Sequence, residues 1–228
     1  MTVQIDKPSV RPSGLQPVRW SGRLAVGGLL LAGAAWVVHG VWEIRLALAG
    51  EPASGPPDQG DGVHRPLTAL ENSYHLVTAF GGGAVLLCAL SFVSWLWRLR
   101  DNARALSGRG PRYGGVWVYL GWIFPVVNLW VPRGIVVDAL EATAPGRRRP
   151  VSVDVWWGLW LIGMLSGVGI VYRDSTDEII ARAYSEVWPL LASDVAVVAA
   201  AVAGVFAVRA VTRVQDERMR AVAGDPER

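Results

Sequence analysis

The 228-residue chain has little of what disulfide-bonded proteins and soluble enzymes are built from. Its one cysteine, Cys88, lies inside an apolar run, so a single chain can form neither a disulfide nor a multi-cysteine metal site. The sequence contains no nucleophile motif, no phosphate-binding glycine loop and no paired-carboxylate arrangement. We therefore expect a protein that is not an enzyme, with no cofactor and no resident metal.

Charge is also scarce, at 18% of residues, whereas 52% are apolar. A helix needs roughly 20 apolar residues to cross the hydrocarbon core of a bilayer. Four apolar runs approach or reach that length, and a fifth is interrupted by Pro125. The four are 24–41, 76–97, 155–171 and 190–208, and the fifth is 116–131. This pattern predicts an all-α, polytopic membrane helix bundle.

The distribution of basic residues decides how the interrupted run is placed. If all five runs crossed, the 22 lysines and arginines would divide 11 and 11 between the two sides. If the run that contains Pro125 returns to the side it came from, the division becomes 18 and 4, and omitting the 155–171 run instead gives 14 and 8. Short cytoplasmic loops carry the excess of lysine and arginine. We predict four transmembrane helices and a proline-broken re-entrant or interfacial element between the second and third, with five spans as the alternative.

This topology places both termini in the cytoplasm of a bacterium, with the chain a multi-pass protein of the plasma membrane. Residues 1–22 are predicted to be a disordered cytoplasmic tail, residues 23–212 the helix bundle, and residues 213–228 a cytoplasmic helical tail. A group of arginines would lie at the cytoplasmic headgroups, where contact with anionic lipid contributes about 1 kcal/mol per residue. These are Arg98, Arg100, Arg104, Arg147, Arg148 and Arg149. Nothing in the segment resembles a nucleic-acid reading motif, so no nucleic-acid partner is expected.

Asp194 is the polar residue that the bundle has to accommodate. It lies well inside the last apolar run, where a carboxylate costs about 2.5–3.5 kcal/mol and usually faces a partner within the bundle. His39 enters the first helix at a comparable depth, and we predict it as the partner, with Arg173 as the second choice. Asp194, His39 and Asn128 form a predicted proton or ion site. The alternatives are that Asp194 fixes helix register through one buried contact, and that the Asn128 amide caps the helix that begins at Pro132.

A second polar group is predicted at the outer ends of the first two helices. It contains Glu43, Glu71 and His75, next to His39. Two histidines with carboxylates are ligand types for zinc or copper, and they also relay protons. The alternative is that these are ordinary polar residues at a membrane interface.

The segment from 97 to 132 carries a motif. It consists of an R-x-x-x-N-A-R sequence followed by a W-x-x-P-x-x-N-L-x-x-P core, and its principal residues are Arg98, Asn102, Arg104, Trp122, Pro125, Asn128 and Pro132. In these residues the chain resembles an actinobacterial integral-membrane family catalogued as domain of unknown function 4328, over roughly residues 75–215. The resemblance implies a bundle of several spans and brings no established activity.

Three functions remain open from the sequence. The favoured one is a non-enzymatic interaction or regulatory module that oligomerises, or holds a membrane-protein partner, through small-residue helix faces. The second is a small proton- or cation-coupled transporter or channel that uses Asp194 and the Pro125–Pro132 element. The third is a membrane enzyme that acts on lipid at the outer histidine and glutamate cluster.

Overall fold

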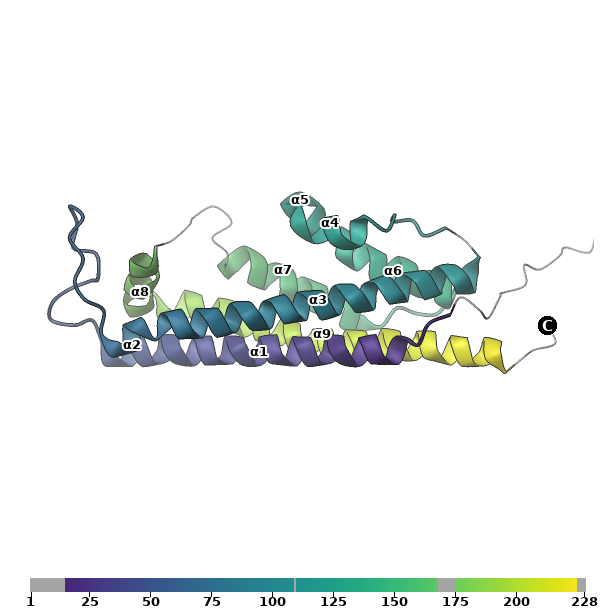
Figure 1. Cartoon of the computed structure of the whole chain (residues 1–228), viewed down its shortest axis with the longest axis horizontal. Coiled ribbons are helices and arrows are strands. Elements are labelled where there is room, and N and C mark those ends of the chain that lie inside the picture. Colours follow the sequence, from purple (N-terminus) through teal and green to yellow (C-terminus); the bar gives the residue numbers. More distant parts are fainter. Residues whose placement is uncertain (1–14, 109, 168–174, 225–228) are drawn as a thin grey trace, which may run out of the picture. The chain divides into compact units, whose positions relative to one another are not determined.

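The computed structural model describes residues 15–108, 110–167 and 175–224, and within them the protein is all-α, as predicted. An isolated β-bridge joins Asp58 and His64. The described part of the chain contains no β-strand. The helices, labelled in Figure 1, are α1 (Val18–Ala49), α2 (Ala69–Asn72), α3 (Tyr74–Ser107), α4 (Trp117–Ile123), α5 (Pro125–Asn128), α6 (Val131–Thr143), α7 (Val151–Gly167), α8 (Thr176–Ser185) and α9 (Val187–Ala223).

Three of the described helices are long and apolar enough to cross a membrane. They are α1, the α2–α3 segment and α9, with 32, 39 and 37 residues, and counting the bent α4–α6 pair as one span gives four. The predicted membrane class therefore holds, while the count of four crossings stays a prediction. The predicted crossing at 155–171 corresponds to α7, an apolar helix of 17 residues that is shorter than the three candidate spans, so this crossing stays a prediction. Residues 168–171 of that run lie outside the described part of the chain.

The predicted proline break is present between α4 and α6. Phe124 has an extended backbone (φ −84°, ψ 115°), Pro125 begins α5, and Pro132 lies in the first turn of α6. Proline is accommodated in a first helical turn because the backbone N–H that it lacks would have no intrahelical partner there. The axes of 117–123 and 126–143 differ by 112°.

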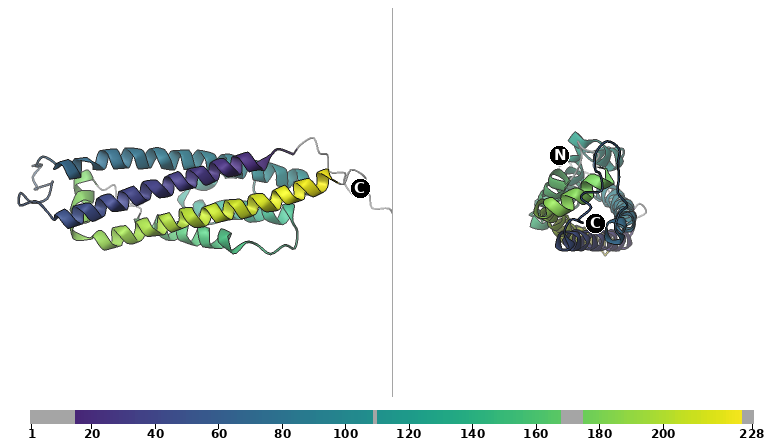
Figure 2. Two further views of the ribbon diagram at one scale, coloured as in Figure 1. Left: turned by 90° about the horizontal axis from the view of Figure 1, so that it is seen from below. Right: turned by 90° about the vertical axis from the view of Figure 1, so that its left-hand side faces the viewer.

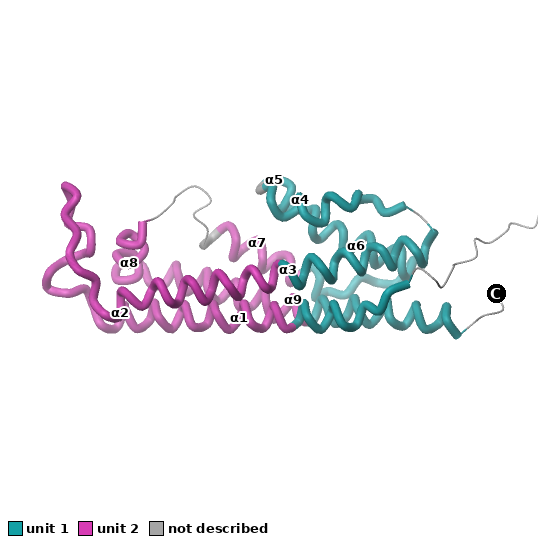
Figure 3. Tube along the Cα trace, in the orientation of Figure 1, with its two compact units in different colours: residues 1–26, 90–154, 206–228 teal, residues 27–89, 155–205 magenta. Residues whose placement is uncertain are grey.

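The chain divides into two compact units, coloured separately in Figure 3. Unit 1 comprises residues 1–26, 90–154 and 206–228, and unit 2 comprises residues 27–89 and 155–205. Within unit 2, α1 and α9 run side by side in Figures 1 and 2, and α7 packs on α9. A Cβ atom on Gly163 would lie only 2.7 Å from Val197 Cγ2, so this glycine allows the close approach of α7.

Helix α8 packs near one end of α1 in unit 2. Ser175 caps α8 through a reciprocal capping box with Glu178, which satisfies two backbone donors of the first turn. The buried face of α8, Ile180 and Ala183, packs against Trp42 and Leu46 of α1. Asp177 and Glu178 lie away from this buried face, so α8 is an amphipathic helix.

The core of unit 1 is formed by segments of α3, α6 and α9. Trp95, Leu96 and Leu99 of α3 and Ile135 and Val136 of α6 are almost completely buried. Helix α9 continues without a break as far as Ala223, so most of the predicted tail at 213–228 belongs to this long helix.

Candidate functional site

The candidate site of unit 2 consists of His39, Glu43 and Asp194, called the trio below. His39 and Glu43 lie one turn apart on α1, and Asp194 lies on α9. His39 Nδ1 is 3.0 Å from Asp194 Oδ2, as predicted for this pair, and 3.6 Å from Glu43 Oε1. One ligand atom from each residue lies within 4.8 Å of the other two. Two different apolar helices thus supply one polar centre.

The trio is short of hydrogen-bond donors. The side chains of Glu43 and Asp194 are only 2% and 8% exposed, and that of His39 is 22% exposed. Glu43 Oε2 is buried and has no hydrogen-bond partner. One imidazole nitrogen faces both carboxylates, and it can donate fully to one of them. A buried carboxylate oxygen without a donor is costly, so the geometry calls for a further proton or a cation.

Apolar groups surround the trio. The rings of Trp36 and Trp42 flank the His39 ring, with centroid distances of 5.3 and 5.9 Å. Trp42 also packs, together with Leu46 one turn later on α1, against Ile180 of α8. A low-polarity surrounding strengthens the electrostatic interaction of the carboxylates with any positive charge.

Glu71 and His75, predicted in the outer cluster with Glu43, take part in other interactions. The Glu71 carboxylate accepts hydrogen bonds from both Arg65 terminal nitrogens (2.9 and 2.7 Å), the Thr68 backbone N–H and the Tyr184 hydroxyl. Burial, followed by this bond to Glu71, raises the pKa of Tyr184 to about 12. His75 is exposed, and its ring contacts Tyr74. Glu71 therefore ties α2 to α8 and to the loop that contains Arg65.

Asn128, the third residue of the predicted ion site, is buried at the end of α5 in unit 1. The alternative role as the cap of α6 is wrong, because the N-cap of α6 is Trp130, which makes no side-chain capping bond. Arg173, the second predicted partner of Asp194, lies outside the described residues.

The motif residues gather in unit 1 and hold its segments together. The Asn102 amide exchanges two hydrogen bonds with the backbone of Gln16 (3.0 and 2.8 Å) and donates to Gln215 Oε1. Arg98 donates to Gln16 Oε1, and the Trp122 ring packs on Phe92. Pro125 and Pro132 begin α5 and α6, as described above. For Arg98, Asn102 and Trp122 these contacts indicate a structural role.

The predicted lipid-contact arginines differ in exposure. Arg100 is largely buried and donates to the Tyr113 carbonyl, Arg147 pairs with Glu217, and Arg149 pairs with Asp154. Arg104 and Arg148 are exposed. Some arginines of this group therefore form contacts within unit 1, and others are exposed on its surface.

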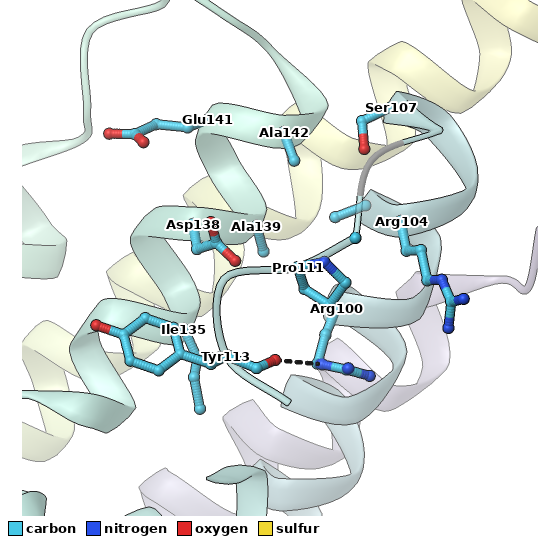
Figure 4. A pocket seen from close by; sticks show the side chains of 12 residues that line it. Arg100, Arg104, Ser107, Pro111, Tyr113, Ile135, Asp138, Ala139, Glu141 and Ala142 are labelled. Atoms are coloured by element: carbon cyan, nitrogen blue, oxygen red, sulfur yellow. Dashed lines mark hydrogen bonds between the residues drawn. The ribbon is translucent and has the colours of Figure 1, made fainter. Parts of the chain in front are cut away.

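A pocket of about 180 Å³ lies between α3, α6 and the segment before α4 in unit 1 (Figure 4). Arg100 and Arg104 contribute positive charge to its wall, and Asp138 and Glu141 contribute negative charge. Asp138 already accepts the Arg112 backbone N–H at 2.9 Å. Because the charges balance, this pocket favours no class of ion.

Sequence reasoning missed two parts of this arrangement. Glu43 was assigned to the outer cluster beside His39, and its approach to Asp194 was not foreseen, although a residue four positions after His39 shares its helix face. The Arg65–Glu71 pair was not foreseen, although Thr68 and Glu71 show the T-x-x-E spacing of a capping box, which the structure contains.

These features define an all-helical protein with three or four helices able to span a membrane and a polar centre between two of them. A family model described as Domain of unknown function (DUF4328) matches residues 67–213, and the chain belongs to this family. No curated protein and no solved structure matches the chain. The matched range contains the whole motif segment, Glu71 and Asp194, and begins after His39 and Glu43.

Proposed function

We propose that this protein is a small, non-enzymatic, multi-pass protein of the bacterial plasma membrane that binds a proton or another cation at the trio during coupled transport. The observation that carries the proposal is the buried Glu43 oxygen without a donor, beside Asp194 and a single imidazole nitrogen. Ionisable residues inside membrane helices are costly and typically mark ion or proton pathways.

The proposed topology has four crossings, both termini in the cytoplasm and the α4–α6 element returning to the cytoplasmic side. It is supported by charge, because unit 1 contains 18 of the 22 lysines and arginines, and short cytoplasmic segments carry the excess of these residues. The exposed residues Arg104 and Arg148 would then contact anionic headgroups from the cytoplasm.

Cysteine labelling in intact cells tests this topology. In a Cys88→Ser background, Arg148→Cys is expected to react only after the membrane is permeabilised. Gly60→Cys, in the loop after α1, is the matched control and is expected to react from outside. Labelling of Arg148→Cys from outside would contradict the topology.

Transport is tested in proteoliposomes with an imposed pH gradient and an internal pH-sensitive dye. Asp194→Asn removes the charge that faces His39, and we expect it to abolish proton flux. Asp177→Asn is the control, because Asp177 also pairs with a histidine of unit 2 (His64, 2.8 Å) but lies on α8, outside the candidate spans. Equal flux in the two variants, or no flux in the unmodified protein, would contradict a transport role.

The interaction module is the second candidate, and one observation favours it. Cβ atoms added at Gly81, Gly82 and Gly83 of α3 would meet nothing within 4 Å, and Phe80 and Leu86 beside them are exposed. A second copy or another membrane helix could pack closely on such a face. Gly82→Leu should then lower the oligomeric mass measured in detergent, whereas an unchanged mass would remove this support.

A further inference from the structure

We propose that the trio is a metal site, in which His39 Nδ1 and one carboxylate oxygen each from Glu43 and Asp194 bind a divalent transition-metal ion of the zinc class. This inference rests on the proposed function, since it names the cation that the site would take. It goes further by stating which ion chemistry these three side chains select.

The first argument is geometric. Zinc binds imidazole nitrogen and carboxylate oxygen at about 2.0–2.2 Å, so two ligand atoms of one tetrahedral ion lie about 3.3–3.5 Å apart. In the trio, Nδ1 is 3.0 Å from Asp194 Oδ2 and 3.6 Å from Glu43 Oε1. All three ligand atoms lie within 4.8 Å of one another. Side-chain adjustments of a fraction of an ångström to about an ångström would bring them around one ion.

The second argument is charge. A neutral imidazole with two carboxylates carries a charge of −2, inside a bundle where unpaired charge is costly. A single proton would leave a net charge of −1, whereas a divalent ion balances the trio. Such an ion would also give a partner to the Glu43 side, where Oε2 lacks one although the residue is only 1% exposed. One divalent ion would therefore both balance the negative charge of the trio and interact with the Glu43 carboxylate.

The third argument is the type of ligand. Calcium takes six to eight oxygen ligands and magnesium prefers octahedral oxygen coordination, so one imidazole with two carboxylates suits neither well. Imidazole together with carboxylate suits zinc and its first-row neighbours. Three protein ligands leave a coordination position open. An open position is what an ion that must enter and leave requires.

Cobalt(II) is the probe for the experiment, because its visible absorption reports a low-symmetry nitrogen and oxygen site directly. The full chain, purified in detergent through a tag without histidine and stripped with a chelator, is titrated with Co²⁺ and then displaced with Zn²⁺. Bound metal is counted by elemental analysis. We expect one ion per chain, with a visible band that zinc removes.

Matched variants separate the trio from the rest of the chain. Loss of even an outer partner of a metal ligand lowers affinity about 10- to 100-fold, so His39→Ala and Glu43→Gln should each cost at least that. His64→Ala/His75→Ala removes the two other histidines and should bind as the unmodified protein does. Circular dichroism identifies variants that fail to fold, and Glu43→Gln keeps the shape of the side chain if His39→Ala does not fold.

Each outcome decides one question. Absence of stoichiometric metal, or loss of binding only in His64→Ala/His75→Ala, would overturn the metal site. Proton flux that still depends on Asp194 would then leave the proposed function standing. Metal binding at the trio without any flux would keep the site and contradict transport.

Discussion

In unit 1 the buried amide groups of Asn102 and Gln215 serve one another and the backbone, because Asn102 donates to Gln215 and Gln215 donates to the Leu99 carbonyl at 2.8 Å. In unit 2 the buried charged groups are the carboxylates of Glu43, Glu71 and Asp194, and those of the trio share one imidazole nitrogen. Amide groups that satisfy each other stabilise packing and need no ligand, whereas carboxylates that lack donors need one. The comparison separates a structural polar network from a candidate binding site.

The two units also differ in formal net charge. Unit 1 has a formal net charge of +9 and unit 2 of −6, which together give the +3 of the chain. The negative charge of unit 2 includes its three buried carboxylates, Glu43, Glu71 and Asp194. An acidic unit attracts cations, and a basic unit suits anionic lipid. Each unit therefore has the charge that its proposed partner requires.

The largest effect is expected from Glu71→Ala, which tests whether every carboxylate of unit 2 is a ligand. The change leaves the Arg65 guanidinium, only 7% exposed, without its carboxylate partner and with backbone carbonyls alone, at a cost on the order of 3 kcal/mol of unfolding free energy. Thermal unfolding in detergent measures this loss. Glu178→Ala, which breaks the exposed capping box of α8, should cost only about 1 kcal/mol. If Co²⁺ binding is lost in a folded Glu71→Ala protein, the separation of Glu71 from the trio is wrong.

Asn102→Ala is expected to have an intermediate effect and tests the other side of the comparison. It removes the bonds to Gln16 and Gln215, and partners left buried without a bond should cost about 1–3 kcal/mol. The Co²⁺ spectrum should not change, because Asn102 belongs to unit 1. Arg104→Ala, at an exposed motif position, is the control and should stay within about 0.5 kcal/mol of the unmodified protein. A spectral change in Asn102→Ala would show that the network in unit 1 is more than structural.

The smallest effect on stability is expected from Gly40→Ala, which tests whether the position of the Asp194 carboxylate affects metal binding at the trio. The added Cβ would lie 3.2 Å from Asp194 Oδ2, closer than ordinary contact, so the carboxylate must shift slightly. We expect a loss of about 1 kcal/mol and a changed Co²⁺ spectrum. Gly33→Ala places a Cβ at the same 3.2 Å from Ala201 Cβ, also between α1 and α9. The Co²⁺ spectrum of Gly33→Ala should match that of the unmodified protein. If it also changed, the distance between α1 and α9, and not contact with Asp194, would explain the change in Gly40→Ala.

Much of the fold and one contact of the site followed from sequence patterns. The long apolar runs predicted the membrane helices, the two prolines predicted the break, and the depth of Asp194 predicted the contact with His39. Helix α8 did not follow, because its short amphipathic sequence is rich in charge and its stability comes from packing on Trp42 and Leu46. The Arg65–Glu71 pair joins a loop to a helix start, where no period connects the residues. Contacts set by tertiary packing leave little trace in local sequence.

Helix α8 has a consequence for how anything would reach the trio. Its ten residues are fastened to unit 2 by the packing of Ile180 and Ala183, by the hydrogen bond from Tyr184 to Glu71, and by the exposed pair of His64 with Asp177. Short elements with few buried contacts open independently of the rest of a protein. If α8 swung aside, Trp42 and Leu46 would be uncovered while α1 and α9 stayed in place. That part of α1, beside Glu43, would then become accessible without any displacement of the two helices that supply the carboxylates.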